Sequence, residues 1–96
     1  MKAMNVLQMI TSEPVKSYAV LKTARFSAHL VVMQQGRQIP PHTSATDAMI
    51  LVLEGKIAFM LNENITVLES GDVFTFGANE IHALQALETA RFLLVK

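Results

Sequence analysis

Cysteine and tryptophan are both absent from this 96-residue sequence. The lack of cysteine excludes disulfide bonds, thiolate metal sites and a thiol nucleophile. Long apolar runs are also absent: the longest, residues 48–53, is far shorter than the roughly 20 residues of a membrane-spanning helix. No long apolar segment with a cleavage site follows Lys2, so the sequence predicts a cytoplasmic protein.

Charge is scarce and balanced, with eight Lys and Arg against eight Asp and Glu. No basic stripe or block occurs, which argues against a nucleic-acid partner. No basic amphipathic helix occurs either, which argues against membrane attachment. Apolar residues make up 51% of the chain. That fraction fits a well-filled core, and it fits equally an oligomer that covers apolar residues on its outside.

Turn residues recur about every ten positions, and no long helical period lies between them. Strand-like segments occur at residues 15–23, 26–35, 49–53, 56–61, 65–68, 73–76, 81–87 and 91–95. Pro40 and Pro41 cannot donate ladder hydrogen bonds, so their segment is expected at a sheet edge or in an extended loop. Residues 1–14 are expected to form an N-terminal arm or an edge strand. The whole pattern predicts an all-β barrel or sandwich.

Two stretches have a spacing that resembles the cupin superfamily. The first motif of that superfamily is glycine, five residues, His-x-His, three or four residues, glutamate, six residues and glycine. The same spacing joins the following residues of this chain: Gly36, His42, Ser44, Ala48 and Gly55.

The second cupin motif is glycine, five residues, Pro-x-Gly, two residues, histidine, three residues and asparagine. Its positions are occupied here by Gly71, Gly77, Asn79, His82 and Ala86. This second match keeps the leading glycine and the histidine of the motif, and it departs from the motif at the other three positions.

The resemblance implies the fold and the assembly of the chain. It implies a double-stranded β-helix, the RmlC-like jelly-roll barrel, made of two antiparallel sheets. A single cupin domain would span residues 1–96, with residues 1–14 as the arm or edge strand and residues 31–95 as the barrel core that carries both motifs. Small single-domain cupins tend to pair as homodimers, so a homodimer is also implied.

The resemblance further implies a metal site of which only part remains. In cupin enzymes the first motif supplies two histidines and a glutamate, and the second supplies one histidine. His42 and His82 match two of these ligands, whereas Ser44 and Ala48 replace the other two. A serine hydroxyl competes weakly with imidazole for a transition metal, and a methyl group binds nothing. Two protein ligands therefore remain where a zinc site has three or four.

Asp47 and His29 are alternative third ligands. Successive side chains of a strand point to opposite faces, so Asp47 is expected to face away from His42 and His82 unless a bulge re-aims it. The facing of His29 depends on strand register, and this residue is expected to be a packed or hydrogen-bonded histidine of the sheet.

His42, Ser44 and His82 are the predicted ligand-binding residues, and His42 and His82 are the candidate ligands of a divalent transition metal. Strand alternation places further residues inward with them: Ala48, Ile50, Val52, Leu84 and Ala86. The pocket would be small and apolar with two imidazoles at its mouth, unless the barrel is filled by its own side chains.

Two functions stay open at this point. The first is a protein that binds a small molecule in the barrel without catalysis. The second is a metal-dependent enzyme, an oxygenase or isomerase, that uses the reduced site of His42 and His82. The residues alone leave open whether the chain is an enzyme.

Met49, Leu51 and Leu53 lie on the strand face opposite the inward set. A barrel wall has only one inner face, so these three side chains need a cover. The sequence predicts a homodimer in which a second subunit covers them, helped by residues 1–10. The alternative is a monomer in which the chain's own N-terminal segment covers them.

Overall fold

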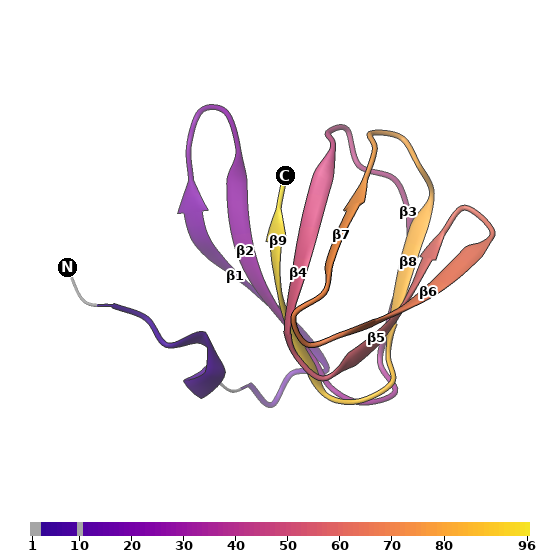
Figure 1. Ribbon diagram of the computed structural model, residues 1–96. Helices are drawn as coiled ribbons and strands as arrows, with labels where there is room; N and C mark the ends of the chain where they lie inside the picture. The colour runs from indigo at the N-terminus through magenta and orange to yellow at the C-terminus, as the bar shows by residue number, and fades with distance from the viewer. Residues whose placement is uncertain (1–2, 10) are drawn as a thin grey trace.

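The computed structural model describes residues 3–9 and 11–96, which form an all-β structure (Figure 1). The strands are β1 (Val15–Lys22), β2 (Ser27–Met33), β3 (Gln38–His42), β4 (Ala48–Glu54), β5 (Lys56–Leu61), β6 (Asn64–Glu69), β7 (Val73–Phe76), β8 (His82–Ala86) and β9 (Ala90–Val95). The helical part of the described chain is a single 3-10 turn, η1 (Val6–Gln8). No helix among these residues has the length and apolar character needed to cross a membrane.

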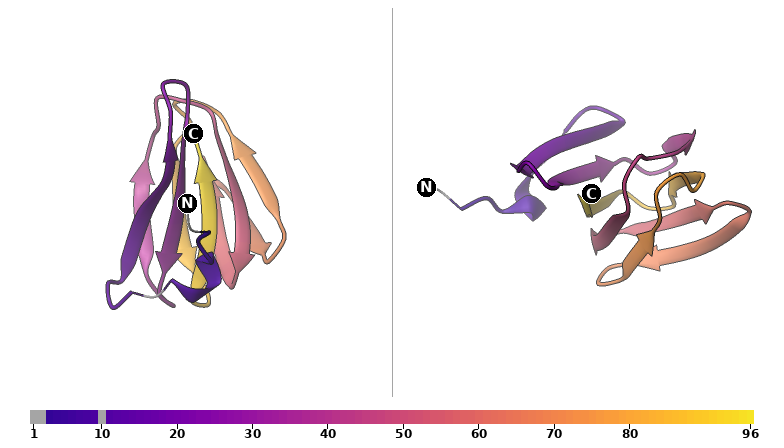
Figure 2. Two further views of the ribbon diagram at one scale, coloured as in Figure 1. Left: turned by 90° about the vertical axis from the view of Figure 1, so that its left-hand side faces the viewer. Right: turned by 90° about the horizontal axis from the view of Figure 1, so that it is seen from above.

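The strands form two antiparallel sheets. The first sheet has the order β1-β2-β9-β4-β7, and the second has the order β3-β8-β5-β6. The view from above in Figure 2 shows the two sheets facing each other as the two walls of a flattened barrel. This arrangement is the predicted jelly roll, and the predicted strand segments all occur, with shifts of a few residues at their ends.

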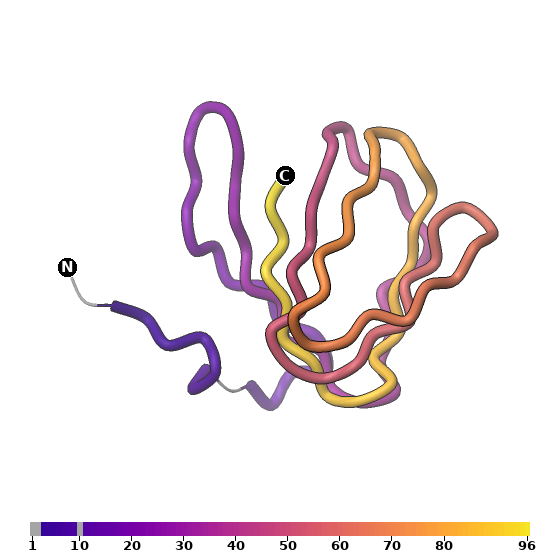
Figure 3. Tube along the Cα trace, viewed as in Figure 1, coloured from indigo at the N-terminus to yellow at the C-terminus, as the bar shows by residue number. Residues whose placement is uncertain are grey.

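The barrel is closed at one end and open at the other. The loops at the upper end of the trace in Figure 3 include residues 23–26, 43–47 and 77–81. The lower end is drawn together by tight turns. One of them contains Gly55, whose φ is +86°, and a Cβ added there would lie 2.2 Å from the carbonyl oxygen of Thr89. This turn therefore requires glycine for both its backbone conformation and its space.

The interior is filled mainly by large apolar side chains. Burial alternates along β4, where Ala48, Ile50 and Val52 are buried and the residues between them are half-buried. Leu84 and Ala86 are buried in the same way on β8. The inward set predicted from strand alternation is therefore confirmed. The largest side chain with no exposed surface is Phe59, and it lies between the two sheets.

The N-terminal residues form an arm. Asn5 caps the single turn η1, because its side-chain oxygen accepts a hydrogen bond from the N–H of Leu7. Arg91 holds the end of this segment by donating from Nε and Nη2 to the carbonyl oxygen of Met9, at 3.1 and 2.9 Å. Among the described residues of range 1–14 no edge strand forms. Met1, Lys2 and Ile10 lie outside the described residues.

The proline segment lies at a sheet edge, as predicted. β3 is the outermost strand of the second sheet and contains Pro40 and Pro41. Its pairing with β8 runs from Ile39 opposite Leu84 to His42 opposite His82. Between these two pairs, Pro40 and Pro41 of β3 face the single residue Ala83 of β8, which is a one-residue bulge at the prolines. The proline nitrogens have no hydrogen to donate to a partner strand. An edge strand tolerates this because one side of its backbone has no partner strand.

Candidate functional site

The site lies at the open end of the barrel, where His42 ends β3 and His82 begins β8. Ile39 and His42 are an odd number of positions apart, so a regular strand would send their side chains to opposite faces. The bulge reverses that alternation, and both residues line the same interior cavity. The two imidazole rings meet edge to face with their centroids 4.1 Å apart. The structure thus brings together the two imidazoles that the sequence analysis placed at the mouth of one pocket.

Each imidazole is held by a backbone carbonyl two residues before it. Nδ1 of His42 lies 2.8 Å from the carbonyl oxygen of Pro40, and Nδ1 of His82 lies 2.9 Å from that of Glu80. A carbonyl oxygen only accepts hydrogen bonds, so Nδ1 carries the hydrogen in both rings. In the neutral state each Nε2 therefore keeps a free lone pair, which accepts a hydrogen bond or binds a cation.

His82 is buried among aromatic rings, with only 3% of its surface exposed. Phe76 packs against it at a centroid distance of 4.5 Å, and the Phe59 ring lies parallel to it at 6.0 Å. Burial lowers the pKa of His82 below its ordinary value of 6.5, and the nearby charge of His42 acts in the same direction. The carbonyl of Glu80 opposes this shift of the pKa without reversing it. His82 is therefore neutral at pH 7. Unlike His82, His42 is exposed to solvent.

Two hollows meet at these rings. Inside the barrel a cavity of about 70 Å³ is lined by apolar side chains and the two imidazoles. Outside it, a cleft of about 460 Å³ opens between residues 22–27 and 42–46. Four residues line both hollows: His42, Phe76, His82 and Leu94. The imidazoles thus stand at the boundary between a small apolar interior and a wider mouth that also carries charged and hydroxyl side chains.

Of the other residues considered from the sequence, Ser44 lines a hollow together with the two rings, whereas Asp47 and His29 line neither hollow. Ser44 lines the mouth cleft in the loop between β3 and β4. Asp47 accepts a hydrogen bond from the N–H of Ala78 at 2.9 Å, and it lines a different cleft. His29 Nε2 lies 3.0 Å from Ser27 Oγ, as expected for a hydrogen-bonded histidine of the sheet.

The donor set does not fit a cupin metal centre with three or four protein ligands. Among residues 3–9 and 11–96, no three histidine, aspartate or glutamate side chains are close enough together to share a metal ion. Ala48 is buried at the glutamate position and offers a methyl group. Glu80, the carboxylate next to His82 in sequence, is occupied: its two oxygens accept from the N–H of Gly77 and the side-chain amide of Asn62.

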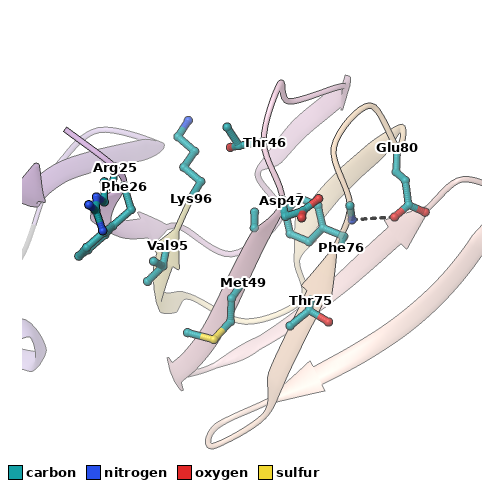
Figure 4. A pocket seen from close by; sticks show the side chains of 12 residues that line it. Arg25, Phe26, Thr46, Asp47, Met49, Thr75, Phe76, Glu80, Val95 and Lys96 are labelled. Atoms are coloured by element: carbon teal, nitrogen blue, oxygen red, sulfur yellow. Dashed lines mark hydrogen bonds between the residues drawn. The ribbon is translucent and has the colours of Figure 1, made fainter. Parts of the chain in front are cut away.

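The structure also brings cationic side chains to the mouth that the sequence analysis did not assign to the site. Lys22 and Arg25 come from the β1–β2 hairpin, and Lys96 follows β9. Arg25 and Lys96 also border a neighbouring cleft of about 790 Å³. In Figure 4 they lie on the opposite side of that cleft from Asp47 and Glu80. No local sequence signal joins these three cations, because strand pairing across the sheet brings them together.

The comparison with protein families agrees with the fold and the motifs. A model of the cupin domain matches residues 29–96, so the chain belongs to the cupin family. Among curated proteins, none matches the sequence significantly.

Solved structures resemble the whole chain. A conserved protein of unknown function from Streptococcus pyogenes is 25% identical, with a TM-score of 0.87 over 98% of this chain and 84% of that one. An RmlC-like cupin from Desulfovibrio desulfuricans is 20% identical, with a TM-score of 0.87 over 99% and 94%. KdgF from a Halomonas species is 23% identical, with a TM-score of 0.79 over 90% and 82%. These likenesses establish the cupin fold of this chain.

Proposed function

We propose that this cupin binds a small, mostly apolar molecule that carries a hydroxyl or another hydrogen-bond donor. The observation that supports this function is the position of two Nε2 lone pairs, on His42 and His82, at the boundary between the interior cavity and the mouth cleft. The donor group of the ligand binds at Nε2, and its apolar part enters between Phe76 and Leu94. Pockets of this kind combine apolar walls with a few orienting polar groups.

The proposed binding uses the imidazole nitrogens directly and needs no metal. The chain supplies only two of the usual cupin metal ligands. A metal-dependent oxygenase or isomerase is the second candidate. The observation in its favour is that both imidazoles donate from Nδ1 to a carbonyl, which is how metal-binding histidines are commonly oriented. No reaction step is assigned to this candidate, because the third and fourth ligand positions hold Ser44 and Ala48.

A thermal-shift screen with small alcohols, amides, carboxylic acids and sugars tests the binding function. A ligand that binds only the folded state stabilises it by about 2.7 kcal/mol at a hundredfold excess over its Kd. We expect that stabilisation to disappear in the His82→Phe variant, which keeps an aromatic ring in the cluster but lacks Nε2.

His29→Phe is the matched control, because His29 lines neither hollow and should leave binding unchanged. Absence of stabilisation by every compound class would contradict the proposed function. Equal stabilisation of the wild type and His82→Phe would show that binding takes place elsewhere.

A further inference from the structure

The positive charges of this chain are unevenly partnered. Seven of the eight lysines and arginines lie in the described residues. Three of the seven form ion pairs with carboxylates: Lys16, Lys56 and Arg91. The other four form no ion pair within the described part of the chain: Lys22, Arg25, Arg37 and Lys96.

Three of these four unpaired cations line the mouth cleft: Lys22, Arg25 and Lys96. No aspartate or glutamate of residues 3–9 and 11–96 lines it with them. The acidic side chains that line the adjoining cleft, Asp47 and Glu80, accept hydrogen bonds from backbone N–H groups. The described lining of the mouth therefore contains three cationic side chains and no carboxylate side chain, in a protein whose formal net charge is zero.

The backbone holds these cations in place around the opening. Ser27 and Lys96 exchange two backbone hydrogen bonds, of 2.7 and 2.9 Å, which join the end of β9 to the hairpin. The hairpin turn is fixed by Thr23, whose Oγ1 accepts from the N–H groups of Arg25 and Phe26. A positive rim on an ordered frame attracts and orients an anion.

We infer that the ligand of the proposed site is a short organic hydroxy acid, bound by its anionic group at the mouth and by its hydroxyl at the imidazoles. This inference rests on the proposed function, which places the donor group at Nε2. The anionic group lies among Lys22, Arg25 and Lys96, and the hydroxyl hydrogen is donated to His82 or His42.

The two halves of the ligand match two different kinds of residue. A neutral imidazole with its hydrogen on Nδ1 offers only a lone pair at Nε2, so it does not bind a carboxylate directly. The lysines and the arginine offer only donors. A ligand with an acidic group and a hydroxyl satisfies both, and its short carbon chain fits the cavity of about 70 Å³.

Four probes of one chain length separate the contributions. They are 2-hydroxypentanoate, 3-hydroxypentanoate, pentanoate, which lacks the hydroxyl, and 2-hydroxypentanamide, which lacks the charge. Butyl phosphate is a fifth probe and distinguishes a phosphate from a carboxylate as the anionic group. Binding to the full chain is followed by amide chemical shifts of residues 22–27 and 42–46 in NMR titrations at pH 7 and low salt.

We expect the better hydroxypentanoate to bind about tenfold more tightly than 2-hydroxypentanamide, because exposed charge pairs each contribute a factor of up to about five. Arg25→Gln and Lys96→Gln should each weaken hydroxypentanoate two- to fivefold and leave the amide unchanged. Raising the salt concentration should weaken only the acid. Arg37→Gln is the matched control, since Arg37 is also unpaired but lies outside the mouth cleft.

The outcomes separate this inference from the proposed function. Equal affinity for the acid and the amide would overturn the anionic ligand and leave the imidazole site in place. The same holds if Arg25→Gln and Lys96→Gln do not change the affinity for the acid. Equal affinity for hydroxypentanoate and pentanoate removes the role of the hydroxyl. Absence of binding by all five probes overturns the inference, and the wider compound screen then decides the proposed function. Tighter binding of butyl phosphate than of every carboxylate supports an anion-binding mouth and makes phosphate the ligand's anionic group.

Discussion

His42, the last residue of β3, and His82, the first residue of β8, are strand partners whose ring centroids lie 4.1 Å apart. Their Nδ1 atoms are both held by main-chain carbonyls, although one ring is exposed and the other is buried. The pair therefore combines one imidazole open to solvent with one whose protonation is opposed by its surroundings.

The stability of the fold should depend on pH through His82. Burial lowers the pKa of this residue in the folded state below 6.5, so between the two pKa values the unfolded chain binds more protons. The free energy of unfolding should therefore fall as the pH drops from about 6.5 through the folded-state pKa, and this contribution should be constant below it. Urea denaturation between pH 4.5 and 8 measures the trend against His82→Phe, in which this component is absent. An identical pH profile in the variant would contradict the assignment.

Replacing Ser44 and Ala48 with metal-binding residues should give the chain a metal site. We expect the wild-type protein, incubated with Zn²⁺ and gel-filtered, to retain much less than one ion per chain by elemental analysis. Ser44→His combined with Ala48→Glu supplies two further ligands, so the variant should approach one ion per chain. Adding His82→Ala to this variant should remove the ion again. Stoichiometric metal in the wild type would favour the enzyme candidate over metal-free binding.

Two glycines in turns should differ in how they tolerate alanine. Gly36 has φ +83° with no atom near the added Cβ, so Gly36→Ala should cost only the left-handed backbone penalty of about 1–2 kcal/mol. Gly55→Ala adds a collision with the carbonyl of Thr89, and it should cost more than about 3 kcal/mol. Urea denaturation compares the two, and equal costs would show that the turn at Gly55 relaxes.

Phe59 should be the most costly aromatic residue to truncate. It has no exposed surface and contacts Phe74 and Phe76 at ring distances of 4.8 and 5.1 Å. Phe59→Ala should lower the free energy of unfolding by about 3–5 kcal/mol and enlarge the interior cavity. Ile65→Ala, at a side chain that is 69% exposed, is the control and should cost less than about 0.5 kcal/mol.

We propose that two copies of the chain pair through the outer face of the first sheet. Met49, Leu51 and Leu53 are half-buried there, and Val73, the strand partner of Leu51, is 57% exposed. Covering such side chains is worth roughly 1.5–3 kcal/mol each when burial is complete. Light scattering at micromolar concentration should give about twice the chain mass of 10.6 kDa.

Leu51→Lys should break this dimer, and Val67→Lys, at an exposed position of β6, should not. The arm lies against one end of this face in its own chain, where residues 3–7 line a hollow with Leu53, and its Met4 and Leu7 side chains remain 55% and 54% exposed. A mass near 10.6 kDa for the wild type would refute the dimer. A dimer that survives Leu51→Lys would place the interface on another surface.

The sequence predicted the barrel well because its signals are local. Turn glycines, alternating strands and the spacing of two motifs lie within short stretches, and each is visible without the partner strand. Asn79 illustrates this: it occupies the glycine position of the second motif, and its φ of +66° is one that asparagine tolerates. Asparagine therefore stands at the glycine position of the motif with a left-handed backbone.

The parts that were missed depend on pairing between distant segments. The cationic mouth forms only when Ser27 pairs with Lys96. The facing of His42 relative to Ile39 depends on a bulge that strand alternation alone does not reveal. The arm was ambiguous because a single 3-10 turn capped by Asn5 is too short to produce a helical period.

The order of the first sheet has a consequence for how the protein is made. β9 lies between β2 and β4 in the middle of that sheet, although it follows every other strand along the chain. Until residues 90–95 have been synthesised, β1–β2 and β4–β7 are separate pieces, each with an unpaired edge. Such edges pair readily with other chains, so the nascent protein is most exposed to aggregation late in synthesis. The barrel and its mouth therefore close at the same stage, once β9 has been translated.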